Sequence, residues 1–354
     1  MLKKTIRRLG ALAMVLAMAV SVFAVNASAE GGTEEVVPAT NATVSFTKTI
    51  DMSKAEGANT PAGTYTFTIV PGTAVAATAT TPEIKAGVAG ATIADVVFAY
   101  GDAASKTVNV NFNSVSFPTA GIYRYVITET NSSNTDVETD GNARYLDVYV
   151  VNDGNSRKIK WSILTSTLKN PTKNSDGQWD YGTANKSDGF TNKYTTYTLN
   201  LKKMIAGEMA NMTETFEFTI HFKGTAGASF MYGSDTITLD ENGSATLTIP
   251  ALGHEGTAVI KGIPSTVKYT ITETVKENEG YTTTYTQTDV TGKQDGVTTT
   301  EKEMGKKDNS VEFTNTKDAS TPTGVIMTIA PYALMVVLAG AFAVVFLTRR
   351  NRAE

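Results

Sequence analysis

An internal repeat divides the middle of this 354-residue chain into two halves with the same order of motifs. Two motifs occur once in each half: YVITET at 125–130 and YTITET at 269–274, then FTNK at 190–193 and FTNT at 313–316. Each half also opens on an alternating stretch that ends in lysine, VSFTK at 44–48 and LNLKK at 199–203. Because self-similar segments in a fixed order indicate repeated structural units, we expect two domains, over 42–194 and 196–318.

Both halves have the composition of β-strands. Short stretches rich in Thr, Val, Ile and aromatic residues are separated by turn sequences such as NDGN at 152–155 and DENG at 240–243. β-branched and aromatic side chains fit a pleated, half-buried surface, and clusters of Gly, Asn and Asp mark turns. No long segment between the two ends of the chain has a convincing helical period. The sequence therefore predicts an all-β protein made of two tandem Greek-key β-sandwiches.

The alternation of side chains along a strand assigns six polar residues to the protein interior. Residues two apart on a strand share a face. By this rule the following residues lie in register with the apolar side chains of their stretches: Lys48, Glu129 and Asn192 in the first half, and Lys203, Glu273 and Asn315 in the second. Lys193 and Lys202 fall on the opposite parity, so we expect them in solvent.

A lysine, a glutamate and an asparagine buried together form a reactive set. A lysine in a core is costly unless it is neutral or paired, and burial lowers the pKa of an amine and raises that of a carboxyl group. A neutral amine can attack the side-chain carbonyl of asparagine while a neutral acid polarises the oxygen and moves protons. Ammonia leaves and an amide cross-link remains. The alternative is an ordinary ion pair or a lysine that reaches back to solvent, but the same set in both halves favours cross-links.

The first 29 residues have the pattern of a secretory signal peptide. Basic residues at the start are followed by the apolar stretch LGALAMVLAMAVSVFAV and then by Ala27-Ser28-Ala29. This order, with small residues at the exit, predicts cleavage after Ala29. It leaves 30–41 as a short N-terminal segment. The alternative interpretation of 1–29 is a membrane anchor.

The other end of the chain has the pattern of a C-terminal transmembrane segment followed by a basic tail. Residues 325–347 form a run of 23 residues without a charge, long enough for a transmembrane helix across about 30 Å of hydrocarbon. The tail 348–354 contains three arginines, and the positive-inside rule keeps such a tail in the cytoplasm. We therefore expect a chain that is exported and held at the membrane by its C-terminal end.

A short motif lies directly before this apolar run, in segment 320–324. Its residues are Ser320, Thr321, Pro322, Thr323 and Gly324. Pro-Thr-Gly, an apolar run and an arginine cluster together resemble the sorting signal that sortases recognise in Gram-positive bacteria, although the usual residue between Pro and Thr is missing. Such enzymes cut between Thr and Gly, so the resemblance implies that Thr323 is transferred to an amine. The alternative is an ordinary linker before the anchor.

Composition excludes several other classes of function. The chain has no cysteine and two histidines, which rules out disulfides, thiolate metal sites and a thiol nucleophile and argues against a multi-histidine metal site. The formal net charge is −4, unlike a basic nucleic-acid-binding protein. No Ser-His-Asp order or phosphate loop supports a secreted enzyme with an external substrate. We expect no metal, no cofactor and no nucleic-acid partner.

Taken together, these motifs resemble the two-domain major pilins of streptococci, of the isopeptide-linked T-antigen type. The resemblance covers nearly all of 40–324 and implies immunoglobulin-like sandwiches in tandem. It also implies two bonds, Lys48 to Asn192 with Glu129 as catalyst and Lys203 to Asn315 with Glu273 as catalyst. Such proteins catalyse only this single reaction on themselves.

The same resemblance implies a covalent polymer on the cell surface. In this family sortase joins the C-terminal threonine of one subunit to a lysine that lies a few residues before the first-domain asparagine. Lys186 occupies that place here, and Lys169 and Lys173 are nearby competitors. The implied partners are sortase, further copies of the chain, other pilins and cell-wall peptidoglycan, with the membrane a partner only before sorting.

Two structural roles fit these features. The first is the backbone subunit of a pilus shaft, and the alternative is a wall-anchored adhesin or minor pilin that binds a host ligand. Both classes of protein carry export signals and internal cross-links. An acceptor lysine distinguishes them, because a terminal wall-anchored subunit needs only its own threonine.

Overall fold

The structure, a computed structural model, describes residues 43–175, 177–274, 280–319, 332 and 334–344. The expected signal peptide 1–29, the segment 30–41, the motif 320–324 and the tail 348–354 lie outside these residues. Within the expected span 325–347, residues 332 and 334–344 are helical and exposed. Among the described residues, no helix is both long and apolar enough for a membrane crossing.

The first half of the chain folds into strands and one 3-10 turn. They are β1 (Ser45–Lys54), β2 (Gly63–Pro71), β3 (Ile84–Ala86), β4 (Thr92–Ile93), β5 (Val96–Phe98), β6 (Ser105–Asn111), β7 (Gly121–Ser132), β8 (Val137–Glu138), β9 (Arg144–Asp153), β10 (Ser156–Thr165), β11 (Thr172–Lys173), β12 (Trp179–Asp180), the turn η1 (Thr183–Asn185) and β13 (Gly189–Thr195). One sheet has the order β4-β6-β1-β13-β8, and the other has the order β10-β9-β7-β2-β5 with β3 beside β7. A small sheet pairs β11 with β12.

The second half is built in the same manner. Its strands are β14 (Tyr197–Ala206), β15 (Thr215–Lys223), β16 (Ser229–Tyr232), β17 (Asp235–Thr238), β18 (Ser244–Gly253), β19 (Thr257–Ile263), β20 (Lys268–Glu273), β21 (Thr282–Gln287), β22 (Gln294–Asp295), β23 (Lys302–Glu303) and β24 (Asn309–Thr316). One sheet has the order β17-β16-β19-β14-β24-β21-β22 and the other β18-β15-β20-β23. The prediction of an all-β fold with two tandem sandwiches is confirmed.

Each sandwich has its own apolar core, formed by the alternating inward side chains of its two sheets. In the first core, the Phe46 ring meets Phe67 and Phe190 edge-on, with centroids 5.2 and 5.5 Å apart. In the second core, Phe218 packs against Phe313 at 5.3 Å. Edge-on aromatic pairs at these distances add favourable electrostatics to the burial of their apolar area. The polar side chains that share these faces are therefore surrounded by aromatic rings.

The first and last strands of each half are parallel neighbours. β1 pairs with β13, and β14 pairs with β24. Parallel strands cannot be joined by a short hairpin, so the whole of each half of the chain runs between its two paired strands. The pairing brings together residues that are far apart in the sequence. The chain enters the two sandwiches through β1 and β14, and it leaves them through β13 and β24.

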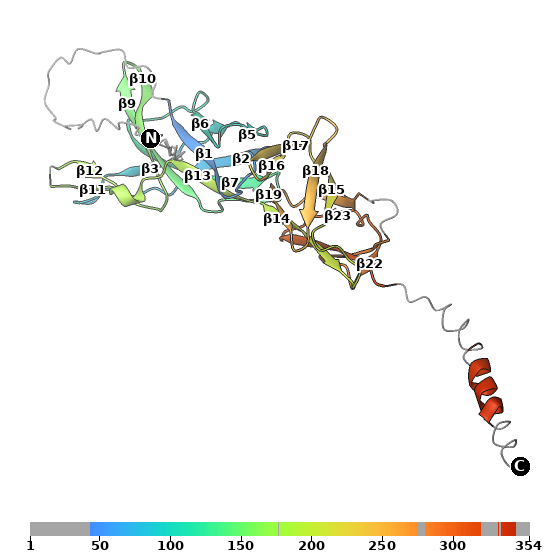
Figure 1. Cartoon of the computed structure of the whole chain (residues 1–354). Helices are drawn as coiled ribbons and strands as arrows, with labels where there is room; N and C mark the ends of the chain where they lie inside the picture. The colour runs from blue at the N-terminus through green and yellow to red at the C-terminus, as the bar shows by residue number, and fades with distance from the viewer. Residues whose placement is uncertain (1–42, 176, 275–279, 320–331, 333, 345–354) are drawn as a thin grey trace, which may run out of the picture.

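The two halves lie end to end and contact each other directly (Figure 1). The Asn59 side chain donates to the carbonyl of Gly227 at 2.9 Å and accepts from the Ser229 N–H at 3.1 Å. Buried Asp136 accepts from the Ser265 N–H at 2.7 Å. These bonds join the halves independently of the chain connection between β13 and β14.

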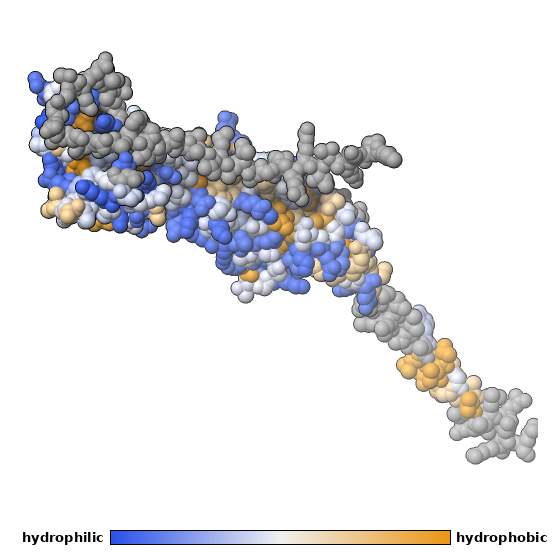
Figure 2. Space-filling model, turned by 90° about the vertical axis from the view of Figure 1, so that its left-hand side faces the viewer, coloured by the Kyte–Doolittle hydropathy of each residue, from blue (hydrophilic) through white to orange (hydrophobic). Residues whose placement is uncertain are grey.

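The surface of the sandwiches differs in hydropathy from the C-terminal helix. Figure 2 shows mostly hydrophilic residues over the sandwiches on the face in view and hydrophobic residues gathered on the described part of the helix. Val336, Val337 and Phe342 on this helix are about 70% exposed. Apolar side chains so exposed over a contiguous patch mark a surface for a non-aqueous or protein environment.

Candidate cross-linking sites

The first site forms where β1 and β13 face the opposite sheet. Lys48 on β1 and Glu129 on β7 have fully buried side chains, and Lys48 Nζ lies 2.9 Å from Glu129 Oε2. Asn192 on β13 is also buried, and its Nδ2 donates to Glu129 Oε1 at 2.6 Å. One carboxylate therefore bridges an amine and a carboxamide.

The second site has the same arrangement on different strands. Lys203 on β14 places its Nζ 2.9 Å from Oε2 of Glu273 on β20, with both side chains buried. Asn315 on β24 donates from Nδ2 to Glu273 Oε1. All six residues expected in the interior are buried, and the structure brings them together as two separate sets of three.

The backbone register of the two sites is identical. Lys48 lies opposite Phe190 and Asn192 opposite Ile50. In the second half Lys203 lies opposite Phe313, and Asn315 lies opposite Ile205. In each half the asparagine is thus two residues beyond the partner of the lysine, on the same face of the sheet.

The glutamates also occupy equivalent positions. Glu129 is paired with Phe67 on β2, and Glu273 is paired with Phe218 on β15. Each glutamate lies on the sheet opposite to the lysine and asparagine, so its carboxyl group spans the core between the two sheets. The repeated motif YxITET therefore encodes a glutamate at the same depth in both sandwiches.

Burial controls the charge of the two lysines. Removal from water lowers the pKa of Lys48 below its ordinary value, against the opposing effect of Glu129. Burial likewise lowers the pKa of Lys203 to about 8, and Glu273 opposes this shift. Because a lowered pKa increases the fraction of neutral amine, both sites hold more of the nucleophilic form of lysine than a lysine in water does.

Aromatic rings complete the walls around each amine. Lys48 Nζ lies 4.8 Å from the centre of the Tyr65 ring. Lys203 Nζ lies 4.2 Å from the centre of the Phe216 ring. The rings exclude water from the amine, while their attraction for a cation offsets part of the cost of burying its charged form. Neither ring was predicted from the sequence as part of a site, because the sequence does not distinguish Tyr65 or Phe216 from ordinary core residues.

The first site has a further hydrogen bond that the sequence did not predict. The backbone N–H of Asp140 donates to Asn192 Oδ1 at 2.8 Å. Only the carbonyl oxygen of the amide can accept a hydrogen bond. The bond from Asp140 therefore fixes which way the amide is turned, with the Asn192 NH₂ group toward Glu129. In the second site Asn315 Oδ1 is buried and has no hydrogen-bond partner among the described residues.

An ion pair holds the Asp140 segment against β9. Arg144 Nη2 lies 2.5 Å from Asp140 Oδ2, with both side chains about nine-tenths buried. The Arg144 guanidinium also stacks 4.8 Å from the Phe190 ring. The sequence DGNAR at 140–144 resembles an ordinary turn, so no sequence signal pointed to this role.

The lysines of opposite parity lie in solvent, as expected. Lys193 is exposed. Lys202, next to buried Lys203, keeps 42% of its side chain exposed and pairs with Glu312 at 3.2 Å. The alternation rule therefore separates the buried lysine from its exposed neighbour in the same strand.

The three candidate acceptor lysines lie in one segment, between β10 and β13. Lys169, Lys173 and Lys186 are all exposed. The amine of Lys173 lies 5.2 Å from the centre of the Trp179 ring. Lys186 directly follows the turn η1 and forms an antiparallel bridge with Thr165.

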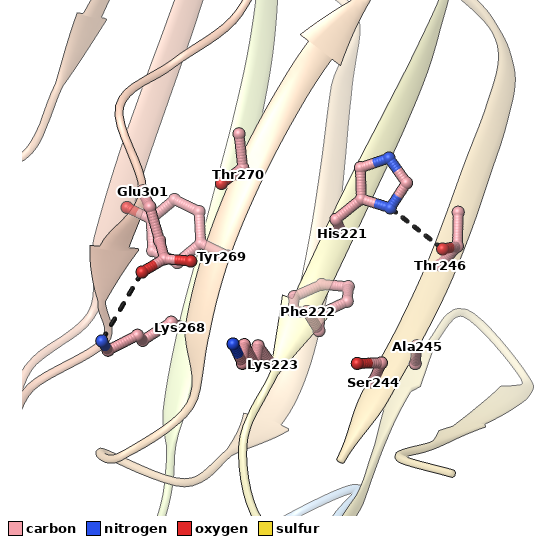
Figure 3. A pocket seen from close by; sticks show the side chains of 10 residues that line it. All are labelled: His221, Phe222, Lys223, Ser244, Ala245, Thr246, Lys268, Tyr269, Thr270 and Glu301. Carbon is pink, nitrogen blue, oxygen red and sulfur yellow. Dashed lines mark hydrogen bonds and ion pairs between the residues drawn. The ribbon is translucent and has the colours of Figure 1, made fainter. Parts of the chain in front are cut away.

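A hollow on the second sandwich is separate from both sites. It holds about 190 Å³ and is lined by residues of β15, β18 and β20 together with Glu301. Figure 3 shows that His221 faces Thr246 there and that Lys268 faces Glu301. None of the six cross-linking candidates lines this hollow, and the described residues contain no cluster of metal-binding side chains.

Comparisons with known proteins match both halves of the chain. Residues 44–195 match the family described as "Spy0128-like isopeptide containing domain", and residues 197–317 match "Domain of unknown function (DUF7601)". The chain is 26% identical over 269 residues to a curated protein named "Pilin" from Streptococcus pyogenes serotype M1, covering 71% of this chain and 74% of that protein.

Solved structures share the fold. The major pilin from Streptococcus pyogenes matches with a TM-score of 0.58 and 22% identity, covering 79% of this chain and 100% of that one. The major pilin protein T3.2 of the same species matches with a TM-score of 0.57 and 20% identity, covering 78% of this chain and 98% of that one. The tandem arrangement of two sandwiches is common to all three proteins.

Proposed function

We infer that this chain is a pilin of the streptococcal T-antigen type and a structural subunit of a pilus. The observation that carries this inference is the pair of buried Lys–Glu–Asn sets in identical registers. The family match of residues 44–195 to an isopeptide-containing domain and the similarity to a curated pilin support it. The chain is a building unit and not an enzyme for an external substrate.

We propose that each buried set forms one internal amide bond. Lys48 joins Asn192 in the first sandwich, and Lys203 joins Asn315 in the second. Glu129 and Glu273 act as the proton carriers, because each carboxyl group contacts both the amine and the leaving NH₂ group.

The geometry supports a sequence of steps that balances. The sequence led us to expect a neutral acid on the amide oxygen, but each glutamate faces the amide nitrogen instead. The neutral lysine amine attacks the asparagine Cγ and gives one proton to the glutamate carboxylate. The bond between Cγ and Nδ2 breaks as that nitrogen takes the proton back from the carboxyl group. Ammonia leaves, the glutamate returns to its starting state, and a new bond joins lysine Nζ to Cγ.

These bonds suit a subunit under tension. Each one joins the strand by which the chain enters a sandwich to the strand by which it leaves. A hydrogen bond of a β-ladder contributes only about 1 kcal/mol net, so a ladder alone can shear under load. A covalent bridge between the two strands carries the load past the rest of the sandwich.

We propose that sortase links subunits by joining Thr323 of one copy to Lys186 of the next. Figure 1 supports a head-to-tail arrangement, because β11 and β12, in the segment with Lys186, lie at one end of the molecule. The described residues leading to the C-terminus leave from the other end. Repetition of one such contact between different surfaces generates a fibre.

Export, sorting and wall attachment belong to the same proposal. The segment 1–29 directs export, and Thr321 to Gly324 followed by the span 325–347 presents the chain to sortase at the membrane. The last subunit is then joined to peptidoglycan. The mature protein is located on the surface of a Gram-positive cell, next to further pilins.

A gel experiment tests the role as a shaft subunit. Cells that express the chain with a pilin-polymerising sortase are expected to give a ladder of high-mass species on denaturing gels. Lys186→Arg is expected to abolish the ladder, while Lys169→Arg and Lys173→Arg, which change neighbouring exposed lysines, leave it intact. A ladder that survives Lys186→Arg contradicts this acceptor, and monomers in every case favour a terminal wall-anchored subunit.

A further inference from the structure

A buried polar cluster on the outer face of the first sandwich has no part in the cross-linking sites. Arg124 on β7 and Asp147 on β9 lie opposite each other in the sheet and are each 1% exposed. Arg124 Nε and Nη2 donate to Asp147 Oδ1 and Oδ2, both at 2.7 Å. This two-point contact fixes the orientation of both groups.

The position of this pair on the sheet is unexpected. Tyr123, Tyr125 and Ile127 face the core, so Arg124 lies on the other side of β7, where a strand normally meets water. The segment between β10 and β13 folds over this side of the sheet and, together with the chain at Gly72, buries Arg124. That segment is the one that carries Lys169, Lys173 and Lys186.

Both ends of the covering segment are bound to the pair. At the near end, Arg124 Nη2 donates to the Lys169 carbonyl at 2.9 Å, and Nη1 donates to Asn170 Oδ1 at 2.7 Å. At the far end, the Tyr181 hydroxyl donates to Asp147 Oδ2 at 2.7 Å. Burial raises the pKa of Tyr181, so its hydroxyl keeps the proton that it donates.

A second set of bonds leads from Tyr181 to Lys186. Asn185 Nδ2 donates to the Tyr181 carbonyl at 2.8 Å across the turn η1. The Asn185 carbonyl accepts from the Ser166 N–H, and the Ser187 N–H donates to the Leu164 carbonyl, both at 2.9 Å. The residues on either side of Lys186 are therefore fixed to the end of β10.

The result is a lysine on a fixed, extended backbone. Thr165, the bridge partner of Lys186, is 2% exposed, while Lys186 itself is exposed. A buried ion pair is weak support for stability, since well-packed apolar residues often serve as well. The directional contacts of such a pair hold the segment bound to it in one conformation. This is useful where the segment has to present one particular side chain.

We propose that Arg124, Asp147 and Tyr181 are positioning residues that hold Lys186 in the form used for subunit linkage and thereby select it over Lys169 and Lys173. This inference rests on the proposed role of Lys186 as acceptor. The selection acts through the backbone of residues 166–175 and 177–188, because the three positioning residues are themselves buried.

The test measures which lysine carries the linkage. The full chain is expressed with a pilin-polymerising sortase, the polymer is digested, and branched peptides at the three lysines are quantified by mass spectrometry. Tyr181→Phe keeps the ring and removes the hydroxyl. Loss of a hydrogen bond to a charged group corresponds to about a tenfold fall in the ratio of Lys186 to Lys169 branches.

Two further variants keep this test decisive. The pair Arg124→Met with Asp147→Leu keeps the covering segment over an apolar surface and is expected to spread the linkage over all three lysines. Tyr269→Phe removes a buried hydroxyl in the second sandwich, outside this cluster, and is expected to leave the ratio unchanged. In each variant, detection of the Lys48–Asn192 linked peptide by its mass shows that the first sandwich has folded.

The outcomes separate this inference from the proposed function. Linkage of the unchanged chain at Lys186, with an unchanged ratio in Tyr181→Phe and in the double variant, overturns the positioning role alone. Absence of linkage at Lys186 in the unchanged chain overturns the acceptor role and the positioning role together. A ratio that falls in both variants and not in Tyr269→Phe supports the proposal.

Discussion

Asn192 stands opposite Ile50, two positions along the parallel strand from the residue opposite Lys48. This offset lets a long lysine side chain reach diagonally to an asparagine on the same face of the sheet. The same offset relates Lys203 to Asn315. Parallel neighbours require a long crossover, and the glutamate comes from the opposite sheet. The reactive set therefore exists only after the first strand, the last strand and the opposite sheet of a sandwich have come together.

Removal of the proton carrier is expected to stop the reaction without unfolding the domain. Apart from the mass change of the substitution itself, Glu129→Ala should leave the chain heavier by one ammonia than the unchanged protein, because the first cross-link does not form while the second does. Glu273→Ala should have the same effect on the second cross-link. Intact-mass spectrometry and far-UV circular dichroism measure the two properties.

A matched variant controls for the loss of a glutamate as such. Glu138 lies exposed on β8, outside the two sites, and Glu138→Ala should keep the mass of the unchanged protein apart from the substitution. If Glu129→Ala also loses both molecules of ammonia, Glu129 is not the proton carrier.

The rate of the second cross-link is expected to rise with pH up to about 8. The attacking form of Lys203 is the neutral amine, and its pKa is lowered to about 8 by burial. Below this pH the neutral fraction increases about tenfold per unit, and above it the increase levels off. The chain can be dissolved from inclusion bodies in urea and diluted into buffers between pH 6 and 9. The loss of ammonia is then followed by mass spectrometry. A rate that is constant or falls between pH 6 and 8 contradicts attack by this amine.

The first cross-link is expected to form faster than the second. The Asp140 N–H donates to Asn192 Oδ1 and can stabilise the negative charge that develops there. In enzymes, one such donor contributes about a hundredfold or more to the rate. Peptide mapping at successive times after dilution from urea should find the Lys48–Asn192 link first.

Arg144→Met tests whether this donor depends on its ion pair. The variant removes the contact that holds Asp140 and keeps apolar packing on Phe190. The first reaction should slow, while the second, in the same molecule, serves as the internal control and should not change. Equal slowing of both reactions, or of neither, argues against the role of the Asp140 segment.

Loss of one cross-link is expected to reduce stability strongly. Asn315→Ala prevents the second bond and leaves the Lys203–Glu273 pair in place. By the chain-entropy relation for cross-links, a closed loop of about 100 residues contributes about 4–5 kcal/mol. Calorimetry should therefore find a large fall in the unfolding temperature of the second sandwich. Asn200→Ala, on the other face of β14, should change it little; equal effects would contradict a covalent contribution.

The alternation of residues along strands predicted the interior positions well, because a strand has a period of two and the pattern occurs twice. Lys203 and its neighbour Lys202 were separated correctly on this basis alone. Asp140 and Arg124 were beyond such reasoning. Asp140 acts through its backbone, which leaves no mark in the sequence, and Arg124 is buried by a segment that is distant in the chain. Local patterns predict which face a side chain occupies, and only the fold shows what covers that face.

The most direct test of the account is the intact mass of the purified chain, followed by mapping of its linked peptides. We expect a mass that is two molecules of ammonia lower than the mass calculated from the residues that the purified chain contains. We also expect branched peptides that join Lys48 to Asn192 and Lys203 to Asn315. A folded chain with the full calculated mass, or links between other residues, would contradict the account.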